Sequence, residues 1–429
     1  MEQKTKEVYF IGIGGIGMSA LAQYFKDQGM AVTGSDREAS PVTELLEKKG
    51  IKVIVGQKKE NVPQNADVVV YSDAVPEDNL ERAQVREFGI PQFSYFAMLG
   101  KVSEGKKTIA VAGTKGKTTT VSMLTKILKD ADVSPTAVIG SLVKDFGSNY
   151  VHGNSDLFIV EACEYRNHLL ELSPHVLVIT NLEWDHTDWF PSLVAVQETF
   201  RKAVMCVPKN GAVITDPNNK NIAPLLSVAK AHVIDYTKEP AYTLRMLGEF
   251  NQSNARAAIA AARAVLPSIS DSVISKSLAT FHGIWRRFEY KGKSGNGADV
   301  YDDYAHNPMS VRAILKALRA QVKGKVFVAF HPHLYSRTRD LLDEFATAFV
   351  DADKVFVAPI YAARESDDGT ISSEMLAERI RATGVDATAL DSFDAIERAL
   401  GAVERGDVIM TMGAGDIYKV ADALVRRGK

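Results

Sequence analysis

Cysteine is nearly absent from this sequence: Cys163 and Cys206 are the only two among 429 residues. Two cysteines cannot build the disulfide framework of a small secreted protein, so we expect a reducing compartment, the cytoplasm. An excess of charge of one sign is missing too, because 51 Lys and Arg face 53 Asp and Glu and leave a formal net charge of −2. This balance gives no general attraction to nucleic acid or to an anionic membrane, and we expect neither as a partner.

Long apolar runs are also scarce. The stretch from Val8 to Phe25 carries no charged residue and is about as long as a bilayer requires. It contains four glycines, however, and lacks the cleavage site of a secretory signal. We therefore expect a buried strand that turns into a helix, without membrane insertion.

What is present is a regular alternation of two kinds of segment. Short β-branched runs such as "EVYFIGI", "KTIAVAG" and "KVFVAF" alternate with amphipathic stretches along the chain. This alternation predicts an α/β fold with mostly parallel sheets and crossover helices. Stretches rich in Gly, Lys and Ser at 98–107 and 291–297 indicate where domains meet. We expect three domains, at residues 1–104, 105–291 and 292–429.

The first glycine-rich loop fits G-x-G-x-x-G at Gly12, Gly14 and Gly17, after a predicted strand and before a predicted helix. Asp36 follows nineteen residues after Gly17, where a nucleotide-binding unit places an acid for a ribose hydroxyl. Glycines at these positions let the backbone approach a diphosphate at the helix N-terminus. The loop predicts a diphosphate site and leaves open whether the ligand is a dinucleotide, as in a dehydrogenase, or a nucleotide-sugar.

The second loop, "GTKGKTTT" at 113–120, lies between a predicted strand and a predicted helix. The common phosphate loop, G-x-x-x-x-G-K-[ST], would place a glycine at position 111, which is Val. The shorter G-x-x-G-K-T form still offers backbone amides and a helix N-terminus to phosphates. Lys117 would neutralise phosphate charge, and Thr118 would offer its hydroxyl to Mg²⁺.

Acidic residues follow two further predicted strands at their carboxyl ends, the edge where the loop also lies. Glu161 and Glu164 follow "DLFIV", and Glu183, Asp185, His186 and Asp188 follow "VLVITN". Glu161 could ligate one Mg²⁺ and His186, as a neutral imidazole, a second one. Two metal ions could then clamp a phosphoryl group during transfer.

Four segments together resemble the Mur ligases, the ATP-dependent amide ligases of peptidoglycan precursor synthesis. They are "GTKGKTTT", "GEFNQSNARAA" at 248–258, "FHGIWRRFE" at 281–289 and "DDYAHNP" at 302–308. The resemblance covers all three expected domains in order. It implies a Rossmann-like UDP-sugar-binding domain, a central ATP-binding P-loop domain with a mostly parallel sheet, and a C-terminal Rossmann-like amino-acid-binding domain.

Other segments resemble one branch of that family, the enzymes that add L-alanine to UDP-N-acetylmuramate. These are "YFIGIGGIGMSALA", "EACEYRNHLL", "FHPHLYSRTRDLLDEFA" and "TMGAGDI". The implied reaction phosphorylates the lactyl carboxylate with ATP, and the amine of L-alanine then attacks the acyl phosphate. The implied enzyme is a monomer or weak homodimer. The alternatives are a ligase that adds a whole murein tripeptide, an NAD-dependent dehydrogenase with an NTPase-like module, and a non-catalytic nucleotide-binding regulator.

The resemblance also implies roles for individual residues, with Lys117, Glu161, His186 and His306 as catalytic and Thr118, Glu161 and His186 as metal ligands. ATP would be bound by Gly113, Thr114, Lys115, Gly116, Lys117, Thr118 and Thr119, with Asn251 and Asn254 at the adenine, Arg287 at the phosphates and Asp303 at the ribose. The UDP-sugar would be bound by Gly12, Gly14, Gly15, Ile16, Gly17, Asp36 and Ser72. Arg166 on the sugar side, and Arg337, Gly413 and Gly415 on the amino-acid side, would hold the two substrate carboxyl groups.

Three positions depart from the pattern of the family. Position 115 is Lys and position 250 is Phe, where His is usual in each case, and position 307 is Asn, where a second His is common. Lys115 adds a charge beside the phosphates, and Phe250 changes the contacts expected at the adenine.

Overall fold

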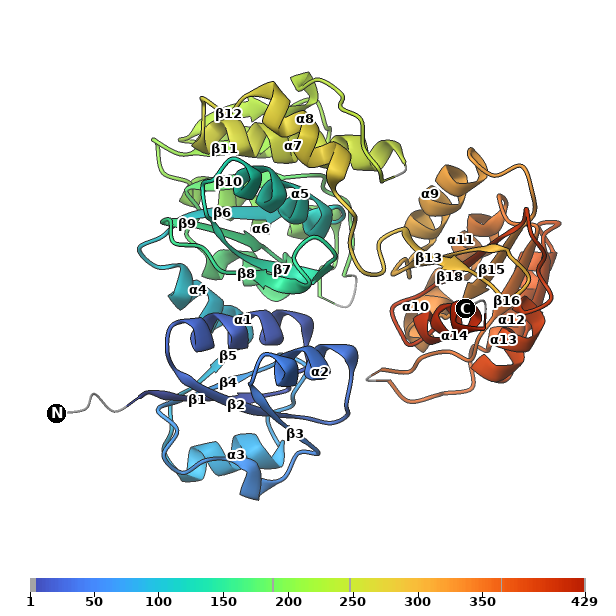
Figure 1. Cartoon of the computed structure of the whole chain (residues 1–429), viewed down its shortest axis with the longest axis horizontal. Helices are drawn as coiled ribbons and strands as arrows, with labels where there is room; N and C mark the ends of the chain where they lie inside the picture. The colour runs from blue at the N-terminus through green and yellow to red at the C-terminus, as the bar shows by residue number, and fades with distance from the viewer. Residues whose placement is uncertain (1–4, 187–188, 247, 364, 428–429) are drawn as a thin grey trace. The chain divides into compact units, whose positions relative to one another are not determined.

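The structure, a computed structural model, describes residues 5–186, 189–246, 248–363 and 365–427. The described chain divides into two compact units. One runs to Arg245 and includes Phe250–His282; the other comprises the short connection before Phe250 and the chain from Gly283 onward. Figure 1 shows the helices and strands of both units.

The first sheet of the first unit has the parallel strand order β3-β2-β1-β4-β5. Its strands are β1 (Glu7–Ile11), β2 (Ala31–Asp36), β3 (Lys52–Val55), β4 (Val68–Tyr71) and β5 (Gln92–Ser94), with helices α1 (Ile16–Asp27), α2 (Pro41–Lys48), α3 (Leu80–Glu87) and α4 (Tyr95–Ser103). Alternate residues of β1 face opposite sides: Phe10 packs in the core with α1, and Tyr9 packs with Val85 of α3. Figure 1 shows α3 on one face and α1 and α2 on the other. The charge-free run at 8–25 is thus a buried strand and helix, as its glycines predict.

The second sheet of this unit has the order β12-β11-β10-β6-β9-β7-β8 and is parallel except for the β7–β8 pair. Its strands are β6 (Lys107–Ala112), β7 (Thr136–Val143), β8 (Ser148–Val151), β9 (Leu157–Glu161), β10 (Val176–Ile179), β11 (Ala212–Thr215) and β12 (His232–Asp235). The helices are α5 (Lys117–Asp130), α6 (Leu193–Cys206), α7 (Glu249–Val265, which begins in the other unit) and α8 (Asp271–Thr280), with short 3₁₀ segments that include η2 (Tyr165–Glu171).

The two sheets of the first unit are joined by α1, which packs against β7 and β8. Tyr24 of α1 packs edge-on against Tyr150 and Phe158. Beside them, buried Gln23 donates to Asn149 Oδ1 (2.9 Å) and accepts from the Ser148 hydroxyl (2.8 Å). Because buried polar groups are costly unless paired, this network fixes how the two sheets dock.

The second unit holds a sheet of order β13-β14-β18-β15-β16-β17, parallel except for the β13–β14 pair. Its strands are β13 (Glu289–Lys293), β14 (Asp299–Asp303), β15 (Val326–Phe330), β16 (Lys354–Val357), β17 (Asp386–Ala389) and β18 (Val408–Met412). Its helices are α9 (Pro308–Arg319), α10 (Tyr335–Asp340), α11 (Leu342–Ala346), α12 (Ser373–Arg381), α13 (Phe393–Leu400) and α14 (Tyr418–Arg426). Val328 and Phe330 pack on one side of the sheet and Ala329 on the other, so both faces are covered.

Within the described residues, no helix is long and apolar enough to cross a membrane.

Candidate functional site

The second glycine loop connects buried β6 to α5 in the first unit, at the carboxyl edge of the sheet. Gly113 and Gly116 have φ values of +130° and +83°, which favour glycine. A Cβ on Gly113 would lie 2.2 Å from Thr180 Oγ1, and one on Gly116 would lie 2.2 Å from Asn254 Oδ1. Both glycines are therefore required by backbone conformation and by neighbours that approach the loop closely.

The end of β10 holds this loop in place. Asn181 donates from Nδ2 to the Lys115 carbonyl (2.8 Å) and accepts from the Lys115 amide at Oδ1 (2.9 Å). The Thr180 hydroxyl donates to the same carbonyl (2.6 Å). The sequence motif does not reveal Thr180 or Asn181, since they follow the loop by more than sixty residues and meet it only through the neighbouring strand.

The unexpected cation Lys115 has a partner within the loop region. Its ammonium lies 2.8 Å from Glu183 Oε2, and the two side chains are 30% and 34% exposed. Half-exposed pairs contribute about 0–1 kcal/mol to stability. The pair therefore contributes little to stability, and its main effect is that Glu183 balances the positive charge of Lys115 in the phosphate loop.

Lys117 is held by the loop and by a buried acid. Its Nζ donates to the Gly113 carbonyl and lies 3.0 Å from Glu164 Oε2. The Glu164 side chain is 2% exposed. Burial acts most strongly and lowers the pKa of Lys117, but Glu164, Cys163 and Glu161 together outweigh it and the pKa is raised. The lysine is consequently a permanent cation at neutral pH.

The acids that follow β9 converge on the start of α5. The Thr118 hydroxyl donates to Glu161 Oε2 (3.1 Å), and the Gly140 amide donates to the other Glu161 oxygen. A Cβ on Gly140 would lie 2.5 Å from that carboxylate, so a larger residue would have to displace it. The strand order β10-β6-β9 makes this meeting possible, because it places the ends of three parallel strands side by side.

His186 lies at the other side of the loop, after β10. Its Nε2 is 3.9 Å from Glu164 Oε1, and its ring centroid is 4.8 Å from that of Tyr165. Its backbone has a φ of +54°, and its amide donates to Asp185 Oδ1 (2.8 Å). Asp188, the last acid of this stretch, lies outside the described residues.

The donors near Thr118 suit Mg²⁺. Among the described residues, no group of three or more His, Cys, Asp or Glu side chains is spaced to hold a metal by itself. Mg²⁺ takes hard oxygen ligands and usually keeps several waters and substrate phosphates, with only one or two carboxylates from the protein. A threonine hydroxyl beside one carboxylate is such a partial set, and the residues fit the ion.

Helix α7 brings Asn254 against the loop, with Asn251 beside it. Asn251 and Asn254 are 1% and 6% exposed, and Asn254 Nδ2 donates to Asn251 Oδ1 (3.4 Å). Thr119, in the first turn of α5, is buried as well. Phe250 is 36% exposed at the start of the helix, which gives the departure at this position a surface location.

The first glycine loop turns from β1 into α1 with Gly15 as the N-cap residue and Ile16 as the first helical residue. The Gly14 amide donates to Asp36 Oδ2 (2.8 Å), so the predicted ribose acid is also a partner of the loop. A Cβ on Gly12 would lie 3.1 Å from Ser72 Cβ. The structure thus brings the predicted UDP side together at one edge of the first sheet.

Tyr95 lies against the first glycine loop, and Arg166 follows β9. A Cβ on Gly17 would lie 2.5 Å from the Tyr95 ring, and burial together with Glu161 raises the pKa of Tyr95. Arg166, in η2 with a φ of +51°, has its guanidinium 5.4 Å above the Tyr165 ring. Tyr95 was missed by sequence reasoning, because a lone tyrosine at the start of a helix carries no motif.

The second unit holds the remaining predicted residues at the carboxyl edge of its own sheet. Asp303 is 4% exposed and accepts from the amides of Phe288 (2.6 Å) and Ala305 (2.7 Å). His306 donates from Nδ1 to the Tyr304 carbonyl (2.9 Å). Because a carbonyl can only accept, this bond places a proton on Nδ1.

The same edge carries the other predicted residues of this unit. Arg337 lies 3.1 Å from His333 Nδ1, and Arg287 stacks 5.3 Å from the Tyr304 ring centroid. Gly413 and Gly415 follow β18. Asn307 accepts from the Ser310 amide (2.9 Å) as the N-cap of α9, which is a structural reason for an asparagine at this position.

Comparisons with known proteins cover nearly the whole chain. Residues 7–107 match a model described as the Mur ligase family catalytic domain, 111–245 the Mur ligase middle domain, and 286–415 the Mur ligase glutamate ligase domain. A UDP-N-acetylmuramate–L-alanine ligase of Acetivibrio thermocellus is 40% identical over 99% of this chain and 96% of its own. One of Clostridium botulinum is 37% identical over 99% and 98%.

Solved structures agree with this likeness. A UDP-N-acetylmuramate–alanine ligase of Thermotoga maritima superposes with a TM-score of 0.82 at 28% identity, over 98% of each chain. A murein peptide ligase of Psychrobacter arcticus has the same fold, with a TM-score of 0.75 at 23% identity over 99% of each chain.

Proposed function

The chain belongs to the Mur ligase family, and we propose that it joins L-alanine to the lactyl carboxylate of UDP-N-acetylmuramate, with ATP converted to ADP and phosphate. The observation that carries this proposal is the full-length identity of 40% and 37% to two L-alanine ligases. The loop at 113–116 and the start of α5 support it, since a nucleoside triphosphate needs backbone amides, a cation such as Lys117 and a hydroxyl such as that of Thr118.

The chemistry assigned to the first unit is phosphoryl transfer to the lactyl carboxylate. Lys117, kept cationic by Glu164, would hold the transferring phosphate, and the loop amides at the start of α5 would hold the others. Thr118 and Glu161 would hold Mg²⁺, which would neutralise phosphate charge, and His186 would hold a second ion. Asn251 and Asn254 would flank the adenine.

The sugar nucleotide would lie on the first glycine loop, with Asp36 and Ser72 beside it and Arg166 at the lactyl carboxylate. The amine of L-alanine would then attack the acyl phosphate, and loss of phosphate would leave the amide. No side-chain nucleophile is needed, so positioning and fixed charge account for the rate.

The second unit would supply the remaining contacts. We assign Arg287 to the ATP phosphates, Asp303 to the ribose, and His306, Arg337 and the Gly413–Gly415 loop to the amino acid. The three-domain division also remains a proposal: the first boundary, 104/105, lies between α4 and β6, and the second, 291/292, falls within β13, after the compact unit begins at Gly283.

Phosphate release from ATP in the presence of UDP-N-acetylmuramate tests this function. We expect release that depends on L-alanine, and less with glycine or L-serine. Release driven only by L-Ala-γ-D-Glu-diaminopimelate would favour the tripeptide ligase, which the full-length comparisons do not favour. NAD(H) binding at Gly12–Gly17 without ATP turnover would favour the dehydrogenase. A monomer or weak dimer in the cytoplasm is proposed with the same reaction.

A further inference from the structure

Two neighbouring arginines of the second unit differ sharply in their surroundings. Arg287 stacks on Tyr304 and is partly exposed, whereas the side chain of Arg286 is 6% exposed. The Arg286 guanidinium donates from Nε to Asp302 Oδ2 (2.9 Å), from one terminal nitrogen to the Gly415 carbonyl (2.8 Å) and from the other to the Gly413 carbonyl. Each of the three guanidinium nitrogens thus donates either to Asp302 or to the loop at 413–415.

The acid is itself fixed. Asp302 is fully buried, and the Thr411 hydroxyl donates to its second oxygen (2.5 Å). Asp302 and Thr411 are paired residues in the β14–β18 register, so the carboxylate is anchored across two central strands. Because an unpaired buried charge is costly, Arg286 cannot leave this position while Asp302 is ionised.

The loop is shaped by these bonds. The carbonyls of Gly413 and Gly415 point at the guanidinium, and in a trans peptide the following amide points the opposite way. The amides of Ala414 and Asp416 therefore face away from Arg286, and among the described residues neither donates to a backbone carbonyl. The carboxylate of Asp416 is occupied by Lys419 (2.6 Å).

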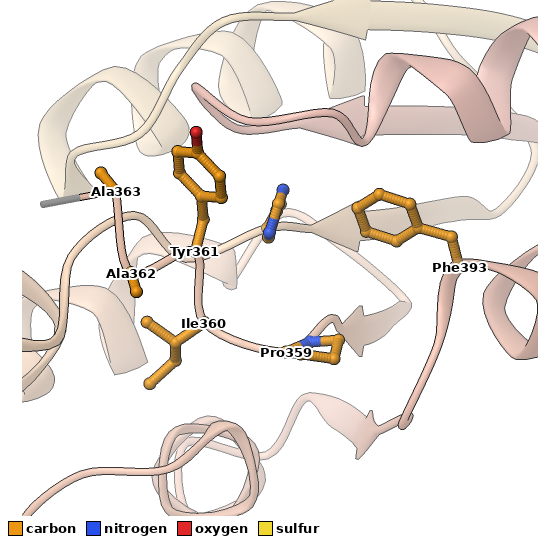
Figure 2. A pocket seen from close by; sticks show the side chains of 7 residues that line it. Pro359, Ile360, Tyr361, Ala362, Ala363 and Phe393 are labelled. Atoms are coloured by element: carbon orange, nitrogen blue, oxygen red, sulfur yellow. The ribbon is translucent and has the colours of Figure 1, made fainter. Parts of the chain in front are cut away.

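A buried polar atom without a partner lies against the same loop. His331 is 5% exposed, and within the described residues its Nδ1 has no hydrogen-bond partner. A Cβ on Gly415 would lie 2.6 Å from that nitrogen. His331 also lines a cavity of about 460 Å³, together with Tyr361 and Phe393, whose side chains Figure 2 shows. A small ligand with a polar group and an apolar part suits these surroundings.

We infer that Arg286 is a positioning residue for the amino-acid substrate: it holds the Gly413–Gly415 loop in the conformation that receives that substrate, while Arg287 serves ATP. The inference rests on the proposed function. It assigns different substrates to two adjacent arginines of one motif: the amino acid to Arg286 and ATP to Arg287.

The test compares Arg286→Lys with Arg287→Lys in the full-length enzyme. Lysine keeps a cation for Asp302 but cannot bridge two carbonyls with a planar fork. We expect Arg286→Lys to raise the KM for L-alanine about tenfold or more and to leave the KM for ATP within about twofold. Arg287→Lys should show the reverse pattern. Thr411→Val, which removes one bond to Asp302, should raise the KM for L-alanine in the same direction but less.

If Arg286→Lys does not fold, Arg286→Met combined with Asp302→Leu replaces the buried pair with apolar groups, an exchange that proteins often tolerate. The same KM pattern is expected for it. An active variant with an unchanged KM for L-alanine, or with all KM values raised equally, overturns the inference and leaves the proposed function standing. A wild-type enzyme that uses no amino acid overturns the proposed function and, with it, this inference.

Discussion

The pair of Lys117 and Glu164 gives a prediction that separates folding from chemistry. Lys117→Met removes the cation 3.0 Å from a carboxylate that is 2% exposed. Removal of one partner from a buried pair costs about 3–5 kcal/mol, because the other charge stays buried. The lower end applies here, about 3 kcal/mol, since the Lys117 side chain is 17% exposed and water can partly replace it.

This loss is large enough to measure by thermal unfolding. In a domain of this size, 1 kcal/mol shifts the unfolding midpoint by about 2 °C, so the first unit should melt about 6 °C lower. The double variant Lys117→Met/Glu164→Gln, which has no buried charge to strand, should recover most of that shift. Neither variant should release phosphate from ATP, because both lack the cation at the phosphates.

A matched control lies in the same helix. Lys126 and Asp130 form an i,i+4 pair on α5 with side chains 16% and 32% exposed. Lys126→Met should cost less than about 1 kcal/mol and keep full activity. The reasoning is refuted if Lys117→Met melts like the wild type, or if the double variant is no more stable than the single one.

Other positions give further predictions. Gly116→Ala should abolish ATP binding in a nucleotide-binding titration, because its Cβ would lie 2.2 Å from Asn254 Oδ1. The control Gly105→Ala, also at positive φ but with open space around it, should bind ATP normally, and equal binding by both variants would contradict this account of the loop. Burial lowers the pKa of His331 to about 4, against about 6.5 when unfolded, so the neutral ring stabilises the fold above pH 6.5 and about 3 kcal/mol of stability is lost as the pH falls towards 4. Denaturant unfolding at several pH values should show this fall in the free energy of unfolding for the wild type and not for His331→Gln. Glu183→Gln removes the partner of the Lys115 cation, so the affinity of this variant for ATP should rise modestly and depend more steeply on salt in the same titration. A fall in affinity would count against the pairing.

Much of the fold follows from the sequence because it depends on local patterns. Alternating apolar runs and glycine turns predict parallel sheets, and the two glycine loops do lie at strand-to-helix turns. The antiparallel β7–β8 and β13–β14 pairs were not anticipated in particular, since short strands look alike in sequence whatever their direction.

Some residues of the candidate site can likewise be predicted from local sequence patterns, and others cannot. Lys117, Thr118 and Glu161 can be found from sequence, because motif spacing and strand ends place them. Thr180 and Tyr95 cannot, because each meets its loop only through a neighbouring strand or helix. Chemical type alone also leaves roles open: Asp36 is a predicted ribose acid, yet it accepts from the Gly14 amide, and the partner of Lys115 becomes visible only in the folded chain.

The central claim is that ATP activates the lactyl carboxylate before L-alanine attacks it. UDP-N-acetylmuramate labelled with ¹⁸O in that carboxylate, incubated with ATP, Mg²⁺ and L-alanine, tests it directly. The account predicts that each phosphate released carries one labelled oxygen, as determined by mass spectrometry, and that the product gains an amide to L-alanine. Phosphate released without the label would contradict it.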